Sequence, residues 1–350
     1  MEIAKALSYH SKVLIMDEPT SSLSEKDVQK LFNVMRKLAA SGMGIVYVSH
    51  RLEELPQIAN RVTVFRDGRY IKTLPIEQAP KSEIIRQMVG DNVAIEQHIK
   101  RDVGDVFFEA RQLSSDGVFS DVSFDLHRGE ILGITGLAGA GRTELVRALY
   151  GADKLEQGQL YLDGKQIKIS SPREAIAHGI AFVTEDRKEE GLVLDHTISD
   201  NINLAVLERI AERFIITQQT EHQLSDTMIR DLHIKCNGRA QLAKNLSGGN
   251  QQKVVIAKWM ATKPNILIMD EPTRGIDVGA KAQIFELLRE LSEEGVGVIM
   301  ISSEIPEILQ YSDRIMVMAE GKVTYTGEND GAITQEQILN YATMASGKAA

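Results

Sequence analysis

Short apolar runs alternate with amphipathic stretches along the chain, and this alternation predicts parallel strands separated by helices. Val13–Met16 and Gly44–Val48 are short runs rich in apolar residues, as is typical of strands buried in a parallel sheet. Similar runs return farther along, at Ile131–Thr135, Ile180–Val183, Ile266–Met269 and Gly297–Ile301. Between the first two runs, apolar residues recur at helical spacing, at Val28, Leu31, Phe32, Met35 and Leu38. We therefore expect an α/β fold.

An internal repeat divides the chain. The segment that begins at Val13 as VLIMDEPT returns at Ile266 as ILIMDEPT, 253 residues later, and the offset holds without a gap to Arg69 and Lys322. The part of the second copy that precedes Val254 has no counterpart in the first copy. We expect the C-terminal part of one unit followed by a complete second unit, as in the C-terminal part of a longer tandem protein.

A polar segment separates the two copies. Residues 91–105 are polar and show no periodicity, so they are expected to be a linker between domains at 1–90 and 106–350. Within the domains, Asp67-Gly68 and Glu320-Gly321 each follow a predicted strand, and such pairs are typical of tight hairpin turns.

A glycine-rich loop, GLAGAGRT at 136–143, follows a predicted strand and precedes a helical pattern. This is the context of a G-x-x-x-x-G-K-[ST] loop, in which backbone N–H groups and a helix N-terminus hold phosphate. Thr143 would supply a hydroxyl to Mg²⁺, and Arg142 stands where the motif has lysine. A glycine turn that only packs a helix on a strand is the alternative. The partner motifs downstream favour phosphate binding.

Each copy ends an apolar strand with two adjacent carboxylates, Asp17-Glu18 and Asp270-Glu271. Burying unpaired charge costs free energy, so two adjacent carboxylates at the end of an apolar strand require a functional or structural explanation. We interpret the Asp as a residue that holds Mg²⁺ and the Glu as one that polarises attacking water. Acids that merely end a strand are the alternative, which the repeated LIMDEPT disfavours.

Two further motifs concern phosphate. LSGGNQQK opens a predicted helix at Ser247–Gly249, where small residues expose N–H groups at the positive helix end, which suits a γ-phosphate presented by a facing domain. An ordinary serine cap is the alternative. The repeat offset places His50 opposite Ser303, just after a strand, where a histidine could sense a γ-phosphate. The other histidines and Trp259 are expected to be structural.

Together these motifs resemble the ATP-binding-cassette (ABC) ATPases. More narrowly, GAGRTEL, VTEDRKEEGLVL, LSGGNQQK and DEPTRGIDVGAK resemble the double-cassette ATPases of bacterial monosaccharide importers for ribose, xylose, arabinose and galactosides. The resemblance implies a P-loop ABC fold and an ATPase that uses ATP and Mg²⁺. It also implies peripheral docking on membrane permease subunits at the cytoplasmic face of the inner membrane, with a periplasmic sugar-binding protein as indirect partner. ATP hydrolysis would energise sugar uptake.

The resemblance also implies roles by position. The catalytic residues would be Glu18, His50 and Glu271, and the metal site would use Asp17, Thr143 and Asp270. The signature would be Leu246, Ser247, Gly248, Gly249, Asn250 and Gln251. The nucleotide-binding residues of the second cassette would be Gly136, Leu137, Ala138, Gly139, Ala140, Gly141, Arg142, Thr143, Glu185, Asp270 and Ser303.

Three positions of the second site depart from the family pattern. Arg142 replaces a lysine, Glu185 a glutamine and Ser303 a histidine, so we expect this site to bind nucleotide while hydrolysing it slowly. The chain lacks the first cassette's phosphate loop, Q-loop and signature. Neither of the family's head-to-tail composite sites is therefore complete within it, and the chain alone is expected to be weakly active or inactive.

Composition narrows the alternatives. The 350 residues carry a formal charge of −9, which gives no support to nucleic-acid binding. No apolar run reaches the ~18–20 residues of a membrane span, and the single cysteine, Cys236, excludes a disulfide framework.

Two hypotheses stay open beside the importer ATPase. One is a nucleotide-binding regulatory or remnant protein without turnover; the other is a cassette ATPase of translation or DNA repair, which the acidic charge disfavours. The sequence does not name the sugar.

Overall fold

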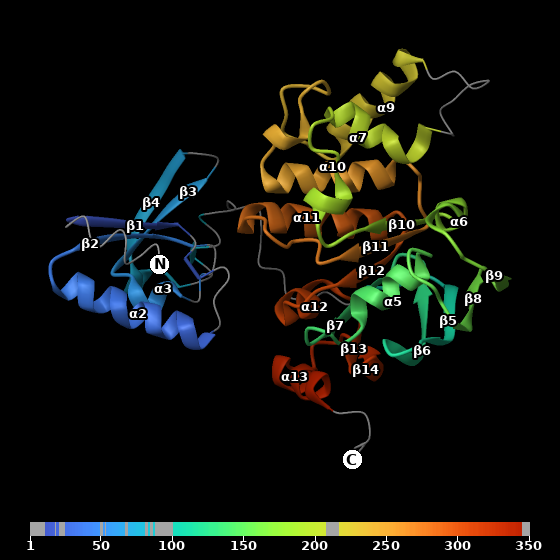
Figure 1. Cartoon of the computed structure of the whole chain (residues 1–350), viewed down its shortest axis with the longest axis horizontal. Helices are drawn as coiled ribbons and strands as arrows, with labels where there is room; N and C mark the ends of the chain where they lie inside the picture. Colours follow the sequence, from blue (N-terminus) through green and yellow to red (C-terminus); the bar gives the residue numbers. More distant parts are fainter. Residues whose placement is uncertain are drawn as a thin grey trace. The chain divides into compact units, whose positions relative to one another are not determined.

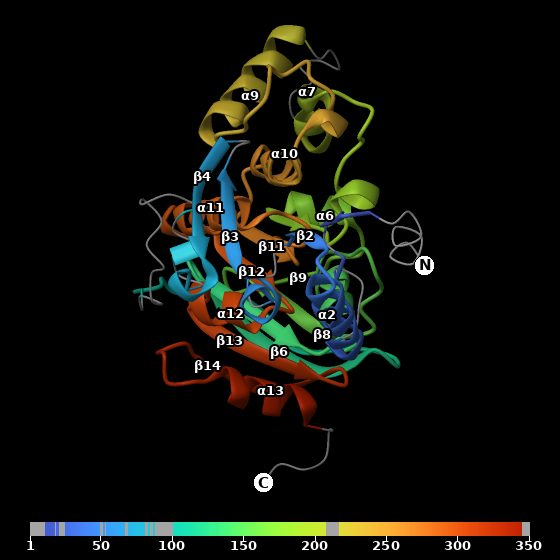
Figure 2. The same cartoon turned by 90° about the vertical axis from the view of Figure 1, so that its left-hand side faces the viewer.

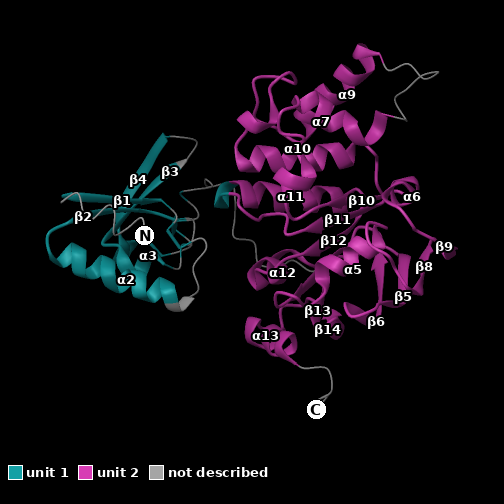
Figure 3. Cartoon of the chain, viewed as in Figure 1, with its two compact units in different colours: residues 1–95, 277–279 teal, residues 96–276, 280–350 magenta. Residues whose placement is uncertain are grey.

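The computed structural model divides the chain into two compact units (Figures 1 and 3). The first comprises Met1–Ile95 and Asp277–Gly279, and the second comprises Glu96–Ile276 and Ala280–Ala350. The structure describes residues 11–17, 19–20, 25–49, 52, 54–66, 69–80, 83–84, 87, 101–207 and 217–344. Glu18, His50, the Asp67-Gly68 turn and most of the predicted linker lie outside the described residues.

The first unit contains two separate pairs of strands. In one pair, β1 and β2 run parallel; in the other, β3 and β4 run antiparallel. Helix α2 carries the predicted apolar stripe, and its buried side chains pack with Leu14 and Met16 of β1. The elements are β1 Val13–Asp17, α2 Glu25–Ala40, β2 Gly44–Val48, α3 Leu55–Ile58, β3 Arg61–Arg66, β4 Arg69–Pro75 and the 3₁₀ turn η1 Ile76–Gln78.

The strands of the first pair are buried on one face only, which corrects the expectation of fully buried strands. Alternate side chains of β1 and β2 remain open to solvent: Val13 is 57% exposed, Ile15 71%, Val46 49% and Val48 47%. Side chains alternate between the two faces of a strand, so these four define one apolar face. We call it the bare face of the first unit.

The second unit is built on a six-stranded sheet in the order β10-β11-β12-β7-β13-β14, parallel except for β14. A four-stranded antiparallel sheet, β6-β5-β8-β9, packs against one of its faces. The first sheet contains β7 Ile131–Gly136, β10 Ile180–Val183, β11 Ile266–Asp270, β12 Gly297–Ile301, β13 Arg314–Ala319 and β14 Lys322–Glu328. The second contains β5 Val106–Ser115, β6 Phe119–His127, β8 Gln157–Leu162 and β9 Lys165–Ile167. All four sequence-predicted strands of this unit are confirmed.

Helices cover the large sheet on both faces. The longer helices α10 and α11 pack on one face in one core cluster, while α5 and the antiparallel sheet pack on the other. Figure 2 shows α7, α9 and α10 at one end of this unit and β14 with α13 at the other. The helices are α5 Arg142–Leu149, α6 Pro172–Ala177, α7 Ile198–Asn203, α9 Gln218–Asp231, α10 Gly248–Met260, α11 Val278–Glu293, α12 Ile305–Tyr311 and α13 Gln335–Thr343. Shorter turns are η2 Arg187–Gly191, η3 Leu204–Val206 and η4 Ala243–Asn245. No helix among these described residues is long and apolar enough to cross a membrane.

The repeat is visible in the elements themselves. The same 253-residue offset relates α2 to α11, β3 to β13 and β4 to β14, with matching ends for the helices. In the second unit β7 pairs with both β12 and β13 and joins them into one sheet. Among the described residues of the first unit, no strand plays that part, so β2 and β3 belong to different sheets.

The turn between β13 and β14 confirms the second predicted hairpin. Glu320 and Gly321 both have positive φ, 48° and 74°, as a two-residue hairpin of the primed type requires. A side chain at Gly321 would clash with the carbonyl oxygen of Val118, so the position is restricted by packing as well as by its backbone.

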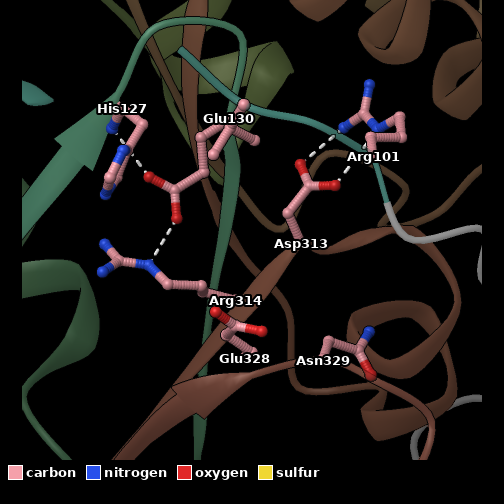
Figure 4. Close-up of a pocket in the computed structure, with 8 residues that line it drawn as sticks. Arg101, His127, Glu130, Asp313, Arg314, Glu328 and Asn329 are labelled. Carbon is pink, nitrogen blue, oxygen red and sulfur yellow. Dashed lines mark hydrogen bonds and ion pairs between the residues drawn. The ribbon is translucent and has the colours of Figure 1, made fainter. Parts of the chain in front are cut away.

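A cluster of charged side chains closes the amino end of β7 and β13 (Figure 4). Arg101 donates to both carboxylate oxygens of Asp313, at 3.1 and 2.6 Å, and Asp313 also accepts from the Ile131 N–H at 2.8 Å. Beside it, Arg314 donates to the fully buried Glu130 at 2.5 Å. These side chains line a cavity of about 170 Å³. Arg101, which falls in the predicted linker, is thereby fixed to the second unit.

Candidate nucleotide site

The glycine-rich loop leaves the carboxyl end of β7 and enters α5. β7 ends at Gly136 and α5 begins at Arg142, so the loop joins the strand to the helix as the motif requires. Gly136 has a positive φ of 155°, and a side chain there would clash with the Met318 carbonyl oxygen. Residues 137–139 are exposed, whereas Ala140 and Gly141 are buried. The tip of the loop therefore faces solvent while its base is packed.

The start of α5 favours an anion. Gly141 occupies the cap position and has no side chain to accept from the first-turn N–H groups. Those groups have no intrahelical partner, and they carry the positive end of the helix dipole. The guanidinium of Arg142, the first helical residue, is largely buried, and its Nη1 has no hydrogen-bond partner. N–H groups at a helix start, beside a guanidinium with one unpartnered nitrogen, suit phosphate oxygens.

Asp270 lies in the same cluster. It ends β11, the strand two places from β7 in the sheet; its side chain is fully buried and neither carboxylate oxygen has a hydrogen-bond partner. Burial raises the pKa of Asp270 to about 6, although the neighbouring Thr143 hydroxyl and the Arg142 guanidinium act in the opposite direction. A buried carboxylate without a donor is costly unless a cation or its bridging water completes it.

The oxygen atoms of Asp270 and Thr143 are suitable ligands for Mg²⁺. The carboxylate of Asp270 and the hydroxyl of Thr143 are hard oxygen ligands, and Mg²⁺ is usually held by one or two carboxylates together with waters and phosphates. No group of three or more His, Cys, Asp or Glu side chains able to hold a metal occurs within the described parts of the chain.

Glu271 is held by Ser303 and faces Arg142. The Ser303 backbone N–H donates to one oxygen of Glu271 at 2.8 Å, and its hydroxyl donates to the other at 3.2 Å. Arg142 Nη2 lies 3.7 Å from the first of these oxygens. Burial raises the pKa of Glu271, and Arg142 and the Ser303 donors oppose that effect. Both carboxylate oxygens are therefore engaged by the protein.

A buried glutamate that the sequence analysis missed supports this arrangement. Glu307 accepts from Thr273 at 2.7 Å and from Ser302 at 2.6 Å, and Lys281 donates to it at 2.9 Å. It thus ties the segment after Glu271 to the residue before Ser303. The pattern recurs in the first unit.

There, the hydroxyls of Thr20 and Ser49 donate to Glu54, at 3.1 and 3.2 Å. Each of these three residues lies 253 positions before its counterpart in the second unit. The repeat offset could therefore have identified Glu54 and Glu307 from the sequence alone.

The LSGG segment begins a helix, as predicted, but lies apart from the phosphate loop. α10 packs on the opposite face of the large sheet from α5. Ser247, at its cap position, is exposed and accepts from Asn250 at 2.9 Å rather than from a backbone N–H, so it is not an ordinary serine cap. Leu246 and Gln251 point into the core, with Gln251 donating to the Ala243 carbonyl at 3.2 Å.

The structure thus brings together some of the predicted site residues. The cluster at the carboxyl ends of β7, β11 and β12 contains Arg142, Thr143, Asp270, Glu271 and Ser303. Glu185 follows β10 and forms an ion pair with Arg274, while Asp17 is exposed at the end of β1. Glu18 and His50 lie outside the described residues. Trp259 packs between the two cores of the second unit, as expected for a structural residue.

Comparison with known proteins identifies relatives along the whole chain. The profile described as ABC transporter matches residues 119–274. The chain is 47% identical over 349 residues to "Ribose import ATP-binding protein RbsA" of Oceanobacillus iheyensis, covering 99% of this chain and 70% of the relative. It is 48% identical over 348 residues to the protein of the same name from Bacillus licheniformis, covering 98% and 70%.

A solved structure shares the fold. The crystal structure of a nucleotide-free ATP-binding cassette from an ABC transporter superposes with a TM-score of 0.57 at 21% identity, covering 68% of this chain and 95% of the cassette. A likeness at this identity concerns the fold alone. It agrees with the P-loop α/β fold expected from the sequence.

Proposed function

Since this chain belongs to the ABC transporter family, as an ATP-binding subunit of import systems, we propose that it energises the uptake of a monosaccharide, with ribose the first candidate. As such a subunit it would dock on membrane permease subunits at the cytoplasmic face of the inner membrane. A periplasmic sugar-binding protein would deliver the sugar. The observation that carries the proposal is the unsatisfied Asp270 carboxylate beside Thr143 and the open start of α5.

Each residue of the cluster has a task in this proposal. Bound ATP would supply the phosphoanhydride bond whose hydrolysis drives transport, with Mg²⁺ neutralising its phosphate oxygens. The loop at 136–143 would hold phosphate through backbone N–H groups, and Arg142 would add charge. Thr143 and Asp270 would orient the metal. Glu271, beside them, would polarise the attacking water.

The contacts of Glu271 support slow hydrolysis in this site. A general base needs a lone pair directed at the attacking water. Here Ser303 donates to both carboxylate oxygens and Arg142 lies close to one of them. These contacts oppose the rise in the pKa of Glu271 that burial causes, and they compete with water for the lone pairs of the carboxylate. We therefore propose a site that binds nucleotide tightly and turns it over slowly.

The positions of α10 and α5 support a composite arrangement. They pack on opposite faces of one sheet, and Ser247 of this unit is exposed, so it would serve a phosphate bound elsewhere. We propose that the LSGG segment completes the site of another cassette, and that Asp17, Glu18 and His50 belong to the nucleotide site of the first cassette. Residues 1–90 would be the C-terminal part of that first cassette, joined by a linker at 91–105 to a second cassette at 106–350.

The bare face of the first unit supports the double-cassette arrangement. Its members Val13 and Ile15 correspond by the repeat to Ile266 and Ile268, which are each only 1% exposed because α5 and the antiparallel sheet cover them. Leaving four large apolar side chains in water is unfavourable by roughly 25 cal/mol per Å². We propose that a segment of the same character as residues 106–253 covers this face.

A nucleotide-binding test examines the site directly. Binding of ATP to the full chain is measured by equilibrium dialysis with and without Mg²⁺. We expect Mg²⁺ to strengthen binding by at least tenfold in the wild type and by less than twofold in Asp270→Asn. Glu294→Gln, an exposed change of the same kind, is the control and should behave as the wild type. Equal Mg²⁺ dependence in Asp270→Asn and the wild type would contradict the site.

A transport test examines the substrate. The gene is deleted from its source strain, and uptake of labelled ribose, xylose, arabinose and galactose is compared before and after complementation. We expect loss and recovery of uptake of one of these sugars. Unchanged uptake of all four, together with normal ATP binding, favours the second candidate, a nucleotide-binding regulatory or remnant protein without turnover. The engaged carboxylate of Glu271 is the observation that keeps this candidate open.

A further inference from the structure

One side chain, Arg187, joins two segments that carry separate motifs. It is the first residue of η2, two positions after Glu185. Its guanidinium donates from Nη1 to the Arg274 carbonyl oxygen at 2.7 Å and from Nη2 to the Gly275 carbonyl oxygen at 3.0 Å. Both carbonyls belong to the loop that follows Asp270 and Glu271. Arg187 therefore fixes the course of that loop.

The same guanidinium lies against the first residue of α10. A β-carbon built on Gly248 would stand 2.9 Å from Arg187 Nη2 and 3.2 Å from the Gly275 carbonyl oxygen. Only a residue without a side chain fits there unless the arginine moves. Since Gly248 belongs to LSGG, Arg187 stands between the start of the signature helix and the loop after β11.

Burying the Arg187 guanidinium costs free energy that an arginine at the surface would not lose. Burial lowers the pKa of Arg187, and its Nε is buried without a hydrogen-bond partner. Charge-assisted donation to two carbonyls offsets that cost. A second tie links the same two segments, because Arg274 forms an ion pair with Glu185. The planar fork of an arginine can donate to two adjacent carbonyls at once, which a lysine cannot do in this geometry.

We propose that Arg187 is a positioning residue that transmits nucleotide binding at Asp270 and Glu271 to the start of α10. The inference rests on the proposed function, because nucleotide binding is its input. A ligand that draws Glu271 away from Ser303 displaces the loop at 271–276. Arg187, bonded to two carbonyls of that loop, carries the displacement to Gly248. The exposed Ser247 then changes its presentation to a partner cassette.

The single tryptophan of the chain provides a reporter for this step. Trp259 lies on α10 near its end, with its ring edge-on to Tyr150 at 5.9 Å and Lys258 above it at 4.8 Å. Movement of α10 relative to Tyr150 changes the surroundings of the indole and hence its emission. ATP binding itself is measured separately, by equilibrium dialysis on the same samples.

The test compares Arg187→Met with Lys188→Met in the full chain. Lys188 is exposed and adjacent, so it is a matched loss of one cation. We expect both variants to bind Mg-ATP within twofold of the wild type. The emission change of Trp259 on ATP addition should persist in Lys188→Met and fall at least fivefold in Arg187→Met. Arg187→Lys, which keeps the charge but not the fork, should recover less than half of it.

A second variant guards against simple misfolding. Gly248→Ala retains Arg187 and displaces it, so it should show the same loss of emission change with a native circular dichroism spectrum. An undiminished Trp259 response in Arg187→Met and Gly248→Ala overturns the inference, as does a wild type that binds ATP without any Trp259 response. A wild type that fails to bind ATP instead overturns the proposed function, and this inference with it.

Discussion

Burial of the Asp270 carboxylate makes the stability of the second unit depend on pH. The pKa of Asp270 is raised to about 6 from an ordinary value of 3.8, chiefly by burial. Between these two values the folded chain keeps a proton that the unfolded chain has released. The folded state therefore loses stability as the pH rises through this window, and the loss is complete above a pH of about 6.

Asp270→Asn is expected to remove this loss. In the absence of nucleotide and Mg²⁺, the advantage of the variant in unfolding free energy should grow by about 1–2 kcal/mol from pH 5 to pH 8, because only the wild type ionises there. Urea unfolding at both pH values measures it, with Glu294→Gln as the exposed control. An advantage that stays constant with pH would show that another group titrates in this range.

Glu307 organises the surroundings of the site through three donors. Glu307→Gln replaces one acceptor oxygen by an amide donor, so a hydroxyl of Thr273 or Ser302 loses its acceptor and Lys281 loses its buried counter-ion. We expect a loss of about 2–4 kcal/mol in unfolding free energy. Glu304→Gln is the matched control. Glu304 also pairs with Lys281 but is 58% exposed, so its loss should stay below about 1 kcal/mol. Equal losses would mean that the lost ion pair with Lys281, and not the lost hydroxyl acceptor, determines the change in unfolding free energy.

At the scale of elements, apolar runs located the strands well because each of these parallel strands consists mostly of consecutive apolar residues. The runs at 44–48, 180–183 and 297–301 match β2, β10 and β12 residue for residue. The periodicity of apolar residues could not show which other elements pack on a strand. β1 and β11 have almost the same sequence, yet Ile15 is 71% exposed and Ile268 is 1% exposed, because their surroundings differ.

In the candidate site, too, local motifs could be predicted from the sequence, whereas contacts between distant residues could not. Gly136–Thr143 and Asp270-Glu271 were predictable because each motif is local and belongs to a strand end. Arg187 was not, because its partners Arg274 and Gly275 lie 87 and 88 residues away and no spacing rule links them. Glu307 is intermediate. Its partners Thr273 and Lys281 are distant in the sequence, but the repeat places Glu54 at the same position in the first copy.

The β13–β14 turn provides a test at this scale. Gly321→Ala places a methyl group against the Val118 carbonyl oxygen at a positive φ of 74°. Backbone strain and overpacking together should cost about 2–4 kcal/mol in unfolding free energy. Thermal unfolding measures the loss. Gly331→Ala, also at a positive φ, 81°, but with open space around the added carbon, isolates the strain and should cost about 1–2 kcal/mol.

At the scale of the whole molecule, the two copies allow a comparison of one repeated sequence in two different structural surroundings. The second unit has two core clusters, one on each face of its large sheet. Among the described residues of the first unit, the core beside β1 and β2 lies on one face of these strands and is formed with α2, while a smaller cluster lies around Leu55 and Val64. One repeated sequence therefore exists in a covered and an uncovered form within a single chain. The stability of the repeat must depend on the segment that completes it, not on its own residues alone.

Paired substitutions at Ile15 and Ile268 measure that dependence. Threonine keeps the β-branched shape, so strand propensity changes little. Ile268→Thr should cost about 2–3 kcal/mol by losing buried apolar contact and burying a hydroxyl, whereas Ile15→Thr should cost less than about 0.5 kcal/mol. Native-state hydrogen exchange of the β11 and β1 amides reads the two costs separately. Equal costs would mean that Ile15 is covered in solution. If a polypeptide resembling residues 106–253 is then supplied and covers the bare face, the cost at Ile15 should rise toward the value at Ile268, because both side chains would be removed from water.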